Sequence, residues 1–143
     1  MQAQVNGTTL FYTTHGHGIP TLLMHGGPGL DHTYFRPWLD ALGDVAELIY
    51  HDHRGNGRSE RPSSLDELNH ETWVEDADRL RAVLGHERIV VLGHSYGGLL
   101  AQEYALAHPE RLAGLILCCT APAMDYQETM IANARARGTS AQF

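Results

Sequence analysis

Residues 93–97, with the sequence GHSYG, place a serine between two glycines in the pattern G-x-S-x-G. The apolar run before it, residues 88–92, predicts a buried strand, and residues 98–108 predict a helix. A serine on a sharp turn between a strand and a helix stands clear of the sheet, where it can attack an acyl carbon. Both glycines are expected where strand and helix pass too closely for side chains. The pattern therefore predicts that Ser95 is a nucleophile.

A second glycine-rich segment, residues 25–29 with the sequence HGGPG, follows the short apolar run at residues 21–24. Acyl transfer needs backbone N–H groups aimed at the oxyanion that forms in the transition state. We predict that Gly27 supplies one such N–H and that Tyr96, at the start of the helix, supplies the other. A turn that only changes the chain direction is the simpler alternative for the glycine-rich segment.

The other residues of these two segments are predicted to support the site without taking part in proton transfer. His94 should point away from the nucleophile, and the histidine of the glycine-rich segment should hold its loop, so neither is expected to act as the base. The supporting residues are His25, Gly26, Pro28, Gly29 and His94.

The partners of a serine nucleophile, a histidine base and an acid that orients it, are harder to find. The residues after Ser95 offer no convincing pair. Asp52 precedes the serine, and its loop at residues 52–59 is predicted to be a buried, hydrogen-bonded or ion-paired turn. Asp125, beyond the last strand, is interpreted as a helix cap rather than as the acid.

Alternating strands and helices must position these groups, which predicts an α/β fold with a parallel sheet. Strands are predicted at residues 21–24, 45–50, 88–92 and 112–119, after a hairpin formed by residues 3–5 and 8–14 around Asn6-Gly7. Helices are predicted at residues 33–42, 98–108 and 125–137, and from a capping box at Thr72 to Gly85. Residues 112–119 would form an unpaired parallel edge.

Side chains that could suggest a cofactor or a redox site have simpler structural interpretations. Phe35, Trp38 and Trp73 are predicted to pack in the core. The adjacent Cys118 and Cys119 lie in an apolar run without metal-like spacing, which predicts buried, reduced thiols.

Composition restricts the class of protein. The chain has 143 residues, 43% of them hydrophobic and 19% charged, which is typical of one soluble globular domain. Its formal net charge of −7 argues against a nucleic-acid partner, and it has no apolar run long enough to span a membrane. The first residues lack the features of a signal peptide, so a cytoplasmic location is expected.

The motifs together resemble those of the α/β-hydrolases. HGGPG at 25–29, DHRGNGRS at 52–59 and GHSYGG at 93–98 occur in the order and approximate spacing of that superfamily, and the HGGPG form most resembles its proline iminopeptidase branch. The resemblance covers the whole chain but only the N-terminal part of the family's domain. It implies an α/β-hydrolase core, incomplete on the C-terminal side, at residues 1–124, and the start of a truncated helical cap at residues 125–143.

The resemblance also implies a mechanism: acyl-enzyme formation at Ser95, without a metal or organic cofactor. In the family, acidic residues of the cap bind the free amine of the substrate, and the catalytic acid and histidine follow the cap. Two residues depart from the prolyl aminopeptidases: Tyr96 stands where these often have tryptophan, and His94 precedes the nucleophile as in esterase-like relatives.

Three functions stay open at this point. The first is release of an N-terminal residue such as proline from a short peptide, and the second is hydrolysis of a small carboxylic ester, thioester or lactone. Epoxide hydrolase and haloalkane dehalogenase chemistry is disfavoured, because those relatives have aspartate where this chain has Ser95. The third is a non-catalytic half-domain that binds a ligand or partner. A completing polypeptide is expected if the short chain is genuine.

Overall fold

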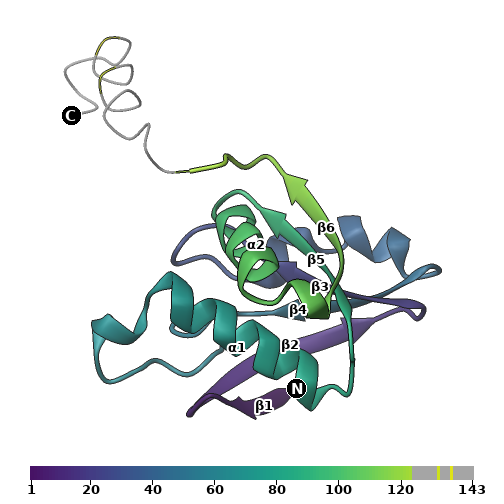
Figure 1. Cartoon of the computed structure of the whole chain (residues 1–143), viewed down its shortest axis with the longest axis horizontal. Coiled ribbons are helices and arrows are strands. Elements are labelled where there is room, and N and C mark those ends of the chain that lie inside the picture. Colours follow the sequence, from purple (N-terminus) through teal and green to yellow (C-terminus); the bar gives the residue numbers. More distant parts are fainter. Residues whose placement is uncertain (124–131, 133–135, 137–143) are drawn as a thin grey trace.

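A central sheet organises the protein, and the computed structural model describes it in residues 1–123, together with residues 132 and 136. Its six strands have the order β1-β2-β4-β3-β5-β6 (Figure 1). Their bounds are Gln2–Val5 (β1), Thr8–His15 (β2), Ile19–Met24 (β3), Ala46–His51 (β4), Ile89–His94 (β5) and Leu112–Cys118 (β6). The first hairpin is antiparallel, as is the pair β2 and β4, whereas β3 is parallel to β4 and β5, and β5 to β6. The predicted α/β fold and its opening hairpin are confirmed.

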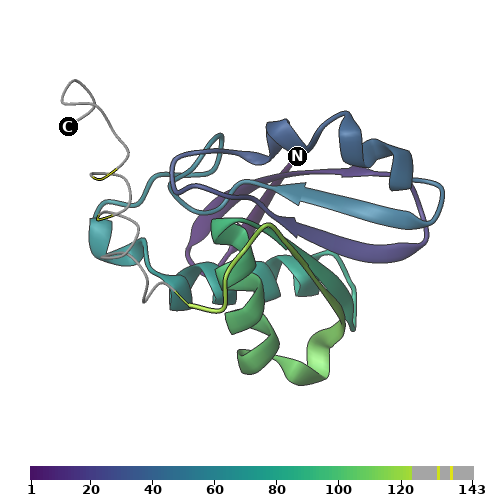
Figure 2. The ribbon, with the colours of Figure 1, turned by 90° about the horizontal axis from the view of Figure 1, so that it is seen from above.

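Helices cover the two faces of the sheet (Figure 2). The α-helices His70–Val83 (α1) and Tyr96–Ala107 (α2) pack on one face, and the 3-10 helices His32–Phe35 (η1) and Trp38–Leu42 (η2) lie on the other. Each face of the sheet has its own hydrophobic core. Because successive side chains of a strand point to opposite faces, Leu22 packs in the core under α1 and α2, and Leu23 packs in the core on the side of η1. Two further 3-10 turns, Leu65–Glu67 (η3) and Pro109–Arg111 (η4), precede α1 and β6.

The predicted helix at residues 33–42 is wrong in type, because the segment forms η1 and η2 instead. Pro37 lacks the N–H that a continuous helix would use, and it favours the extended conformation found at Arg36, with φ −98° and ψ 146°. The prediction for Phe35 is confirmed, since it is buried. Trp38 is 78% exposed, so its predicted core position is wrong. The change to 3-10 geometry replaces the helical spacing on which that prediction depended.

Helix α1 begins two residues before the predicted start. Asn69 is its N-cap, and the side-chain oxygen of Asn69 accepts a hydrogen bond from the Thr72 N–H. Thr72 is therefore inside the first turn, and the predicted capping box is wrong. The predicted end is confirmed, with Gly85 following the helix at φ +83°. Trp73 is buried as expected.

In the sheet formed by residues 1–123, strand β6 lies at the edge, as predicted, and much of its apolar surface is exposed. Leu115, Ile116 and Leu117 are each between 37% and 47% exposed. Cys118 and Cys119 are also exposed, so the prediction of buried thiols is wrong. The error arises because an apolar run indicates a core strand only if a second layer covers it.

The predicted helix at residues 125–137, with Asp125 and Glu128, lies outside the described residues apart from positions 132 and 136. The cap assigned to residues 125–143 therefore stays a prediction. Within the described part of the chain, none of the helices combines the length and apolarity that a membrane span requires.

Candidate active site

Ser95 occupies the junction between β5 and α2 and has a strained backbone. Its φ is +54° and its ψ is −119°, a conformation that residues other than glycine rarely adopt. Such strain costs about 1–3 kcal/mol and persists only where the surrounding structure imposes it. Here the Ser95 N–H donates to the Cys118 carbonyl at 3.0 Å, and the Ser95 carbonyl accepts from the Thr120 hydroxyl at 2.7 Å. The strand–turn–helix geometry predicted for this serine is present.

The glycines on both sides of Ser95 stand where no side chain fits. A Cβ atom at Gly97 would overlap the main-chain oxygen of Met24, and one at Gly93 would overlap the main chain of α2 at Gly97. In both cases the added Cβ would meet backbone atoms, so a change of side-chain rotamer cannot relieve the overlap. The predicted reason for both glycines is confirmed.

The loop after β3 lies directly against this turn. A Cβ at Gly26 would lie 3.1 Å from the Cβ of Ser95. The Gly26 N–H donates to the Tyr34 hydroxyl at 2.6 Å, so it is already satisfied. Gly27 follows at a bend with φ +100°, a conformation that glycine adopts without strain. Further along, the Gly29 N–H donates to the side chain of Asn56 at 2.6 Å.

Tyr34 is a site residue that sequence reasoning missed. Its hydroxyl joins the Gly26 N–H to Nδ1 of His94, which lies 2.9 Å away. It thereby connects the two segments predicted to form the site. No sequence signal identifies it, because Tyr34 belongs to the segment predicted as a regular helix. His94 thus contacts η1, and its ring has no hydrogen bond to Ser95.

His25 forms hydrogen bonds to its own loop and to the loop after β4, and it belongs to a buried group of three histidines. Its Nδ1 donates to the Gly26 carbonyl at 2.8 Å, and its Nε2 accepts from the His53 N–H at 3.1 Å. The His25 and His53 ring centroids are 4.1 Å apart, and those of His51 and His53 are 4.8 Å apart. Burial lowers the pKa of His51 to about 3 and lowers those of His53 and His25. We assign the neutral form to all three in the folded protein.

These lowered pKa values predict that the fold loses stability in mild acid. Below the ordinary histidine pKa of about 6.5 the unfolded chain binds protons that folded His51 and His53 do not, so the free energy of unfolding falls as the pH falls. Between pH 7.5 and 5.5 we expect a loss of about 1.4 kcal/mol for each of the two. Urea denaturation at both pH values measures it.

Two variants control for other titrating groups in this experiment. His51→Leu should show a smaller pH dependence than the wild type, because one of the two buried imidazoles is gone. His17→Gln, at an exposed position, should keep the wild-type dependence. Equal free energies of unfolding for the wild type at pH 7.5 and 5.5 would refute the assignment of neutral, buried histidines.

Asp52 holds the adjoining loop, which confirms the structural interpretation of residues 52–59. It is fully buried and accepts hydrogen bonds from the backbone N–H groups of His32 and Arg58 and from Nδ1 of His32, at 2.6–3.0 Å. Burial opposes ionisation of Asp52, but these hydrogen bonds outweigh it and lower its pKa to about 2. The side-chain ligand atoms of Asp31, His32 and Asp52 lie within 4.8 Å of one another, which is close enough to coordinate a metal ion. Since Asp31 caps η1 and Asp52 is satisfied by its donors, we assign all three to loop structure.

The described residues bring no base to Ser95. None of their hydrogen bonds joins a histidine to the Ser95 hydroxyl, and seven of the ten histidines of the chain contact other partners. These seven are His25, His32, His53, His70, His86, His94 and His108. His51 is enclosed without a partner, and His15 and His17 lie at the turn between β2 and β3.

Two proline iminopeptidases and one epoxide hydrolase are among the known proteins that this chain resembles. The chain is 40% identical over 114 residues to a proline iminopeptidase of Clostridium botulinum strain Hall, covering 79% of this chain and 39% of the relative. A proline iminopeptidase of Saccharolobus solfataricus is 37% identical over 107 residues, covering 74% of this chain and 34% of the relative. The solved structure of the epoxide hydrolase CorEH superposes with a TM-score of 0.80 at 31% identity, covering 87% of this chain and 43% of that chain.

The chain therefore spans well under half the length of these relatives. A family model described as the alpha/beta hydrolase fold matches residues 20–138, which include the strained serine turn and the loop beside it. With the sheet order, the turn at Ser95 and this match in agreement, the chain belongs to the α/β-hydrolase family.

Proposed function

We propose that this chain carries the nucleophilic half of a serine hydrolase, with Ser95 forming the acyl-enzyme. The observation that carries the proposal is the backbone of Ser95, held at φ +54° between β5 and α2. A non-glycine residue kept in such a conformation by backbone contacts indicates a functional constraint. The turn projects the side chain from the end of the sheet, where a substrate carbonyl can approach.

Two backbone N–H groups would stabilise the oxyanion. Tyr96 is the first residue of α2, so its N–H has no acceptor within the helix and lies at the positive end of the helix dipole. On the other side, Tyr34 already takes the Gly26 N–H, which leaves Gly27 as the donor that the loop can offer. Removal of one such donor typically slows acyl transfer about 100-fold to 1,000-fold.

Release of an N-terminal residue such as proline is the substrate class that we favour. The support is the similarity to the two proline iminopeptidases, at 40% and 37% identity. Hydrolysis of a carboxylic ester or lactone is the second candidate. It is favoured by the exposed Ser95 on its strained turn, which suits any acyl substrate.

The similarity to an epoxide hydrolase does not extend to its chemistry. When a carboxylate opens an epoxide it forms an ester, which water can then cleave. Attack by the Ser95 hydroxyl would instead form an ether, which water does not cleave under mild conditions. Serine at this position therefore favours acyl substrates.

We further propose that a polypeptide segment packed along β6 supplies the histidine base and the acid. The support is the exposed apolar surface of β6. The last residue of this strand, Cys118, lies beside Ser95, because its carbonyl accepts a hydrogen bond from the Ser95 N–H. An unpaired edge of this kind is a template for a further strand. Without a base, only the residual rate of the oxyanion hole and of substrate binding would remain.

Hydrolysis in the presence of added imidazole tests this function. Imidazole in solution can act as the base. Turnover of an aryl ester or of prolyl p-nitroanilide, after subtraction of the rate with imidazole and no protein, should therefore rise with imidazole in the wild type and not in Ser95→Ala. Preference for the prolyl arylamide would support the aminopeptidase, and preference for the ester the second candidate. Equal rates for the wild type and Ser95→Ala would support the non-catalytic half-domain instead.

A further inference from the structure

His70, the first residue of α1, connects that helix to the serine turn. Its Nε2 lies 2.5 Å from the Tyr96 hydroxyl, and its Nδ1 lies 2.5 Å from Oε1 of Glu103 on α2. A carboxylate can only accept, so Nδ1 of His70 donates to Glu103. In the neutral imidazole Nε2 then accepts from the Tyr96 hydroxyl, and in the charged form it donates to it. Tyr96 is held in both states.

We propose that His70 is a positioning residue for this site: by holding the Tyr96 hydroxyl, it fixes the backbone at the start of α2, including the Tyr96 N–H that faces the oxyanion. The inference rests on the proposed function, because it concerns one of the two proposed oxyanion donors. His70 itself touches no reacting atom. It acts through Tyr96, and Glu103 orients its ring.

Among the described residues, the Tyr96 hydroxyl has its hydrogen bond with Nε2 of His70. The bonds at the turn, from the Ser95 N–H to the Cys118 carbonyl and from the Thr120 hydroxyl to the Ser95 carbonyl, hold the residue before Tyr96. The Tyr96 ring packs edge-on against Trp73, with centroids 6.0 Å apart. Such apolar contact limits the ring's position without fixing the direction of its hydroxyl. Burial, together with the Glu103 carboxylate, raises the pKa of Tyr96, so the phenol keeps its proton.

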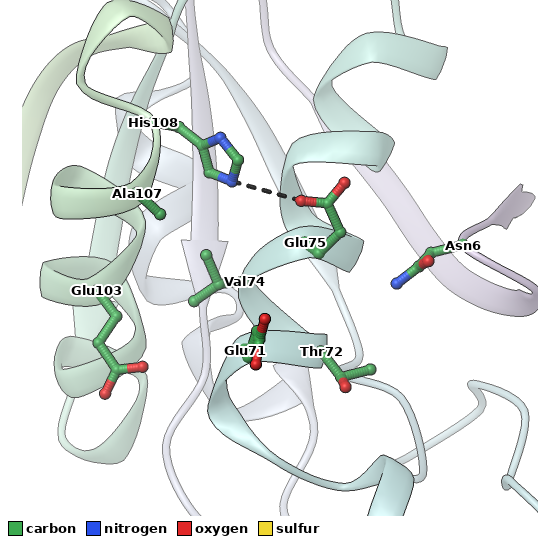
Figure 3. A pocket seen from close by; sticks show the side chains of 8 residues that line it. All are labelled: Asn6, Glu71, Thr72, Val74, Glu75, Glu103, Ala107 and His108. Carbon is green, nitrogen blue, oxygen red and sulfur yellow. Dashed lines mark ion pairs between the residues drawn. The ribbon is translucent and has the colours of Figure 1, made fainter.

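The His70–Glu103 pair is partly exposed, so its effect on the position of Tyr96 can be distinguished from an effect on overall stability. The two side chains are 33% and 45% exposed, and Glu103 lines an open groove of about 560 Å³ between α1 and α2 (Figure 3). Ion pairs at such positions contribute about 0–1 kcal/mol to stability. We therefore expect loss of the contact to alter the serine turn far more than the melting temperature.

Two substitutions of His70 distinguish its two bonds. The side-chain amide of glutamine reaches the position of Nε2, so His70→Gln can keep the bond to Tyr96 and lose the one to Glu103. The amide of asparagine reaches only the position of Nδ1, so His70→Asn can keep Glu103 and lose Tyr96. The proposal predicts that His70→Asn behaves like Tyr96→Phe, and that His70→Gln restores the wild-type behaviour.

The first readout is the backbone order parameter of the Tyr96 N–H from ¹⁵N relaxation, which needs no chemical reactivity. We expect about 0.85 in the wild type and in His70→Gln, and a lower value in His70→Asn and Tyr96→Phe. The second is the rate at which a fluorophosphonate labels Ser95 with imidazole present, expected to fall about tenfold in His70→Asn. Melting temperatures should stay within about 4 °C of the wild type.

Each outcome decides the inference. Equal order parameters in the wild type and His70→Asn would overturn it, as would a His70→Gln that behaves like His70→Asn. If the wild type itself is not labelled, the proposed function fails, and the order parameters still decide whether His70 positions Tyr96.

Discussion

Replacing Gly97 with alanine is expected to destabilise the protein by about 3 kcal/mol or more. The new Cβ would overlap the carbonyl oxygens of Met24, the last residue of β3, and of His25, the residue after it. Overpacking of a side chain costs about 1–3 kcal/mol when neighbours can move, and here the neighbours are backbone atoms of the central sheet and its loop. Chemical denaturation, with the unfolding free energy extrapolated to water, measures the loss.

Gly114→Ala is the matched control for this substitution. Gly114 lies in β6, and a Cβ there would make only an ordinary contact, 3.5 Å from a methyl carbon of Val90. We expect a change within about 0.5 kcal/mol. If Gly97→Ala proved as stable as Gly114→Ala, the close approach of α2 to the loop after β3 would be wrong, and with it the geometry that brings this loop to Ser95.

Replacing Arg54 with alanine is expected to cost about 3–5 kcal/mol, because it leaves the buried carboxylate of Asp76 without its charged partner. Two guanidinium nitrogens of Arg54 donate to Asp76 on α1, at 2.9 and 2.7 Å, and the two side chains are only 6% and 3% exposed. Arg54 also donates to the Asn6 carbonyl at 2.7 Å. The residue thus joins the loop after β4 to α1 and to the first hairpin. Denaturation of the variant at pH 7.5 measures the effect.

Arg79→Ala gives the comparison on the same helix. Arg79 pairs with Glu75 across one turn of α1, but the Arg79 side chain is 60% exposed. Removal of such a surface pair is expected to cost about 0.5 kcal/mol. Similar losses for Arg54→Ala and Arg79→Ala would show that the Arg54–Asp76 pair is not buried as described.

The features that sequence alone could predict depend on local pattern. The serine turn is marked by an apolar strand, two glycines and a helix within about twenty residues, and each of these has a steric reason that the structure shows. The strands can be predicted equally well, because an apolar run between turn residues has few other interpretations. The loop at residues 52–59 belongs here in part. Its polar residues follow a buried strand, and Arg58 and Ser59 donate hydrogen bonds to Asp52 within the loop. The bonds from Asp52 to His32 and from Arg54 to Asp76 join residues 20 and 22 positions apart.

The features that sequence could not predict depend on contacts between distant residues. Tyr34 meets His94, 60 positions away, and His70 meets Glu103, 33 positions away. No periodicity relates such pairs. The exposure of Trp38 and Cys118 was missed for a related reason, because the sequence shows that a segment is apolar but not whether another layer covers it. At the start of α1, Asn69 and Thr72 are both good caps, and only the fold decides between them.

Mass-spectrometric mapping of the fluorophosphonate adduct, in the presence of imidazole, tests the central claim most directly. The claim is that the fold presents Ser95 as an acyl-accepting nucleophile beside an oxyanion hole, and that the base is missing from the described residues. It predicts one adduct, on the peptide that contains Ser95, which increases with imidazole and is absent from Ser95→Ala. A folded chain, verified by circular dichroism, that carries no adduct at Ser95, or carries as much on other serines, would contradict it.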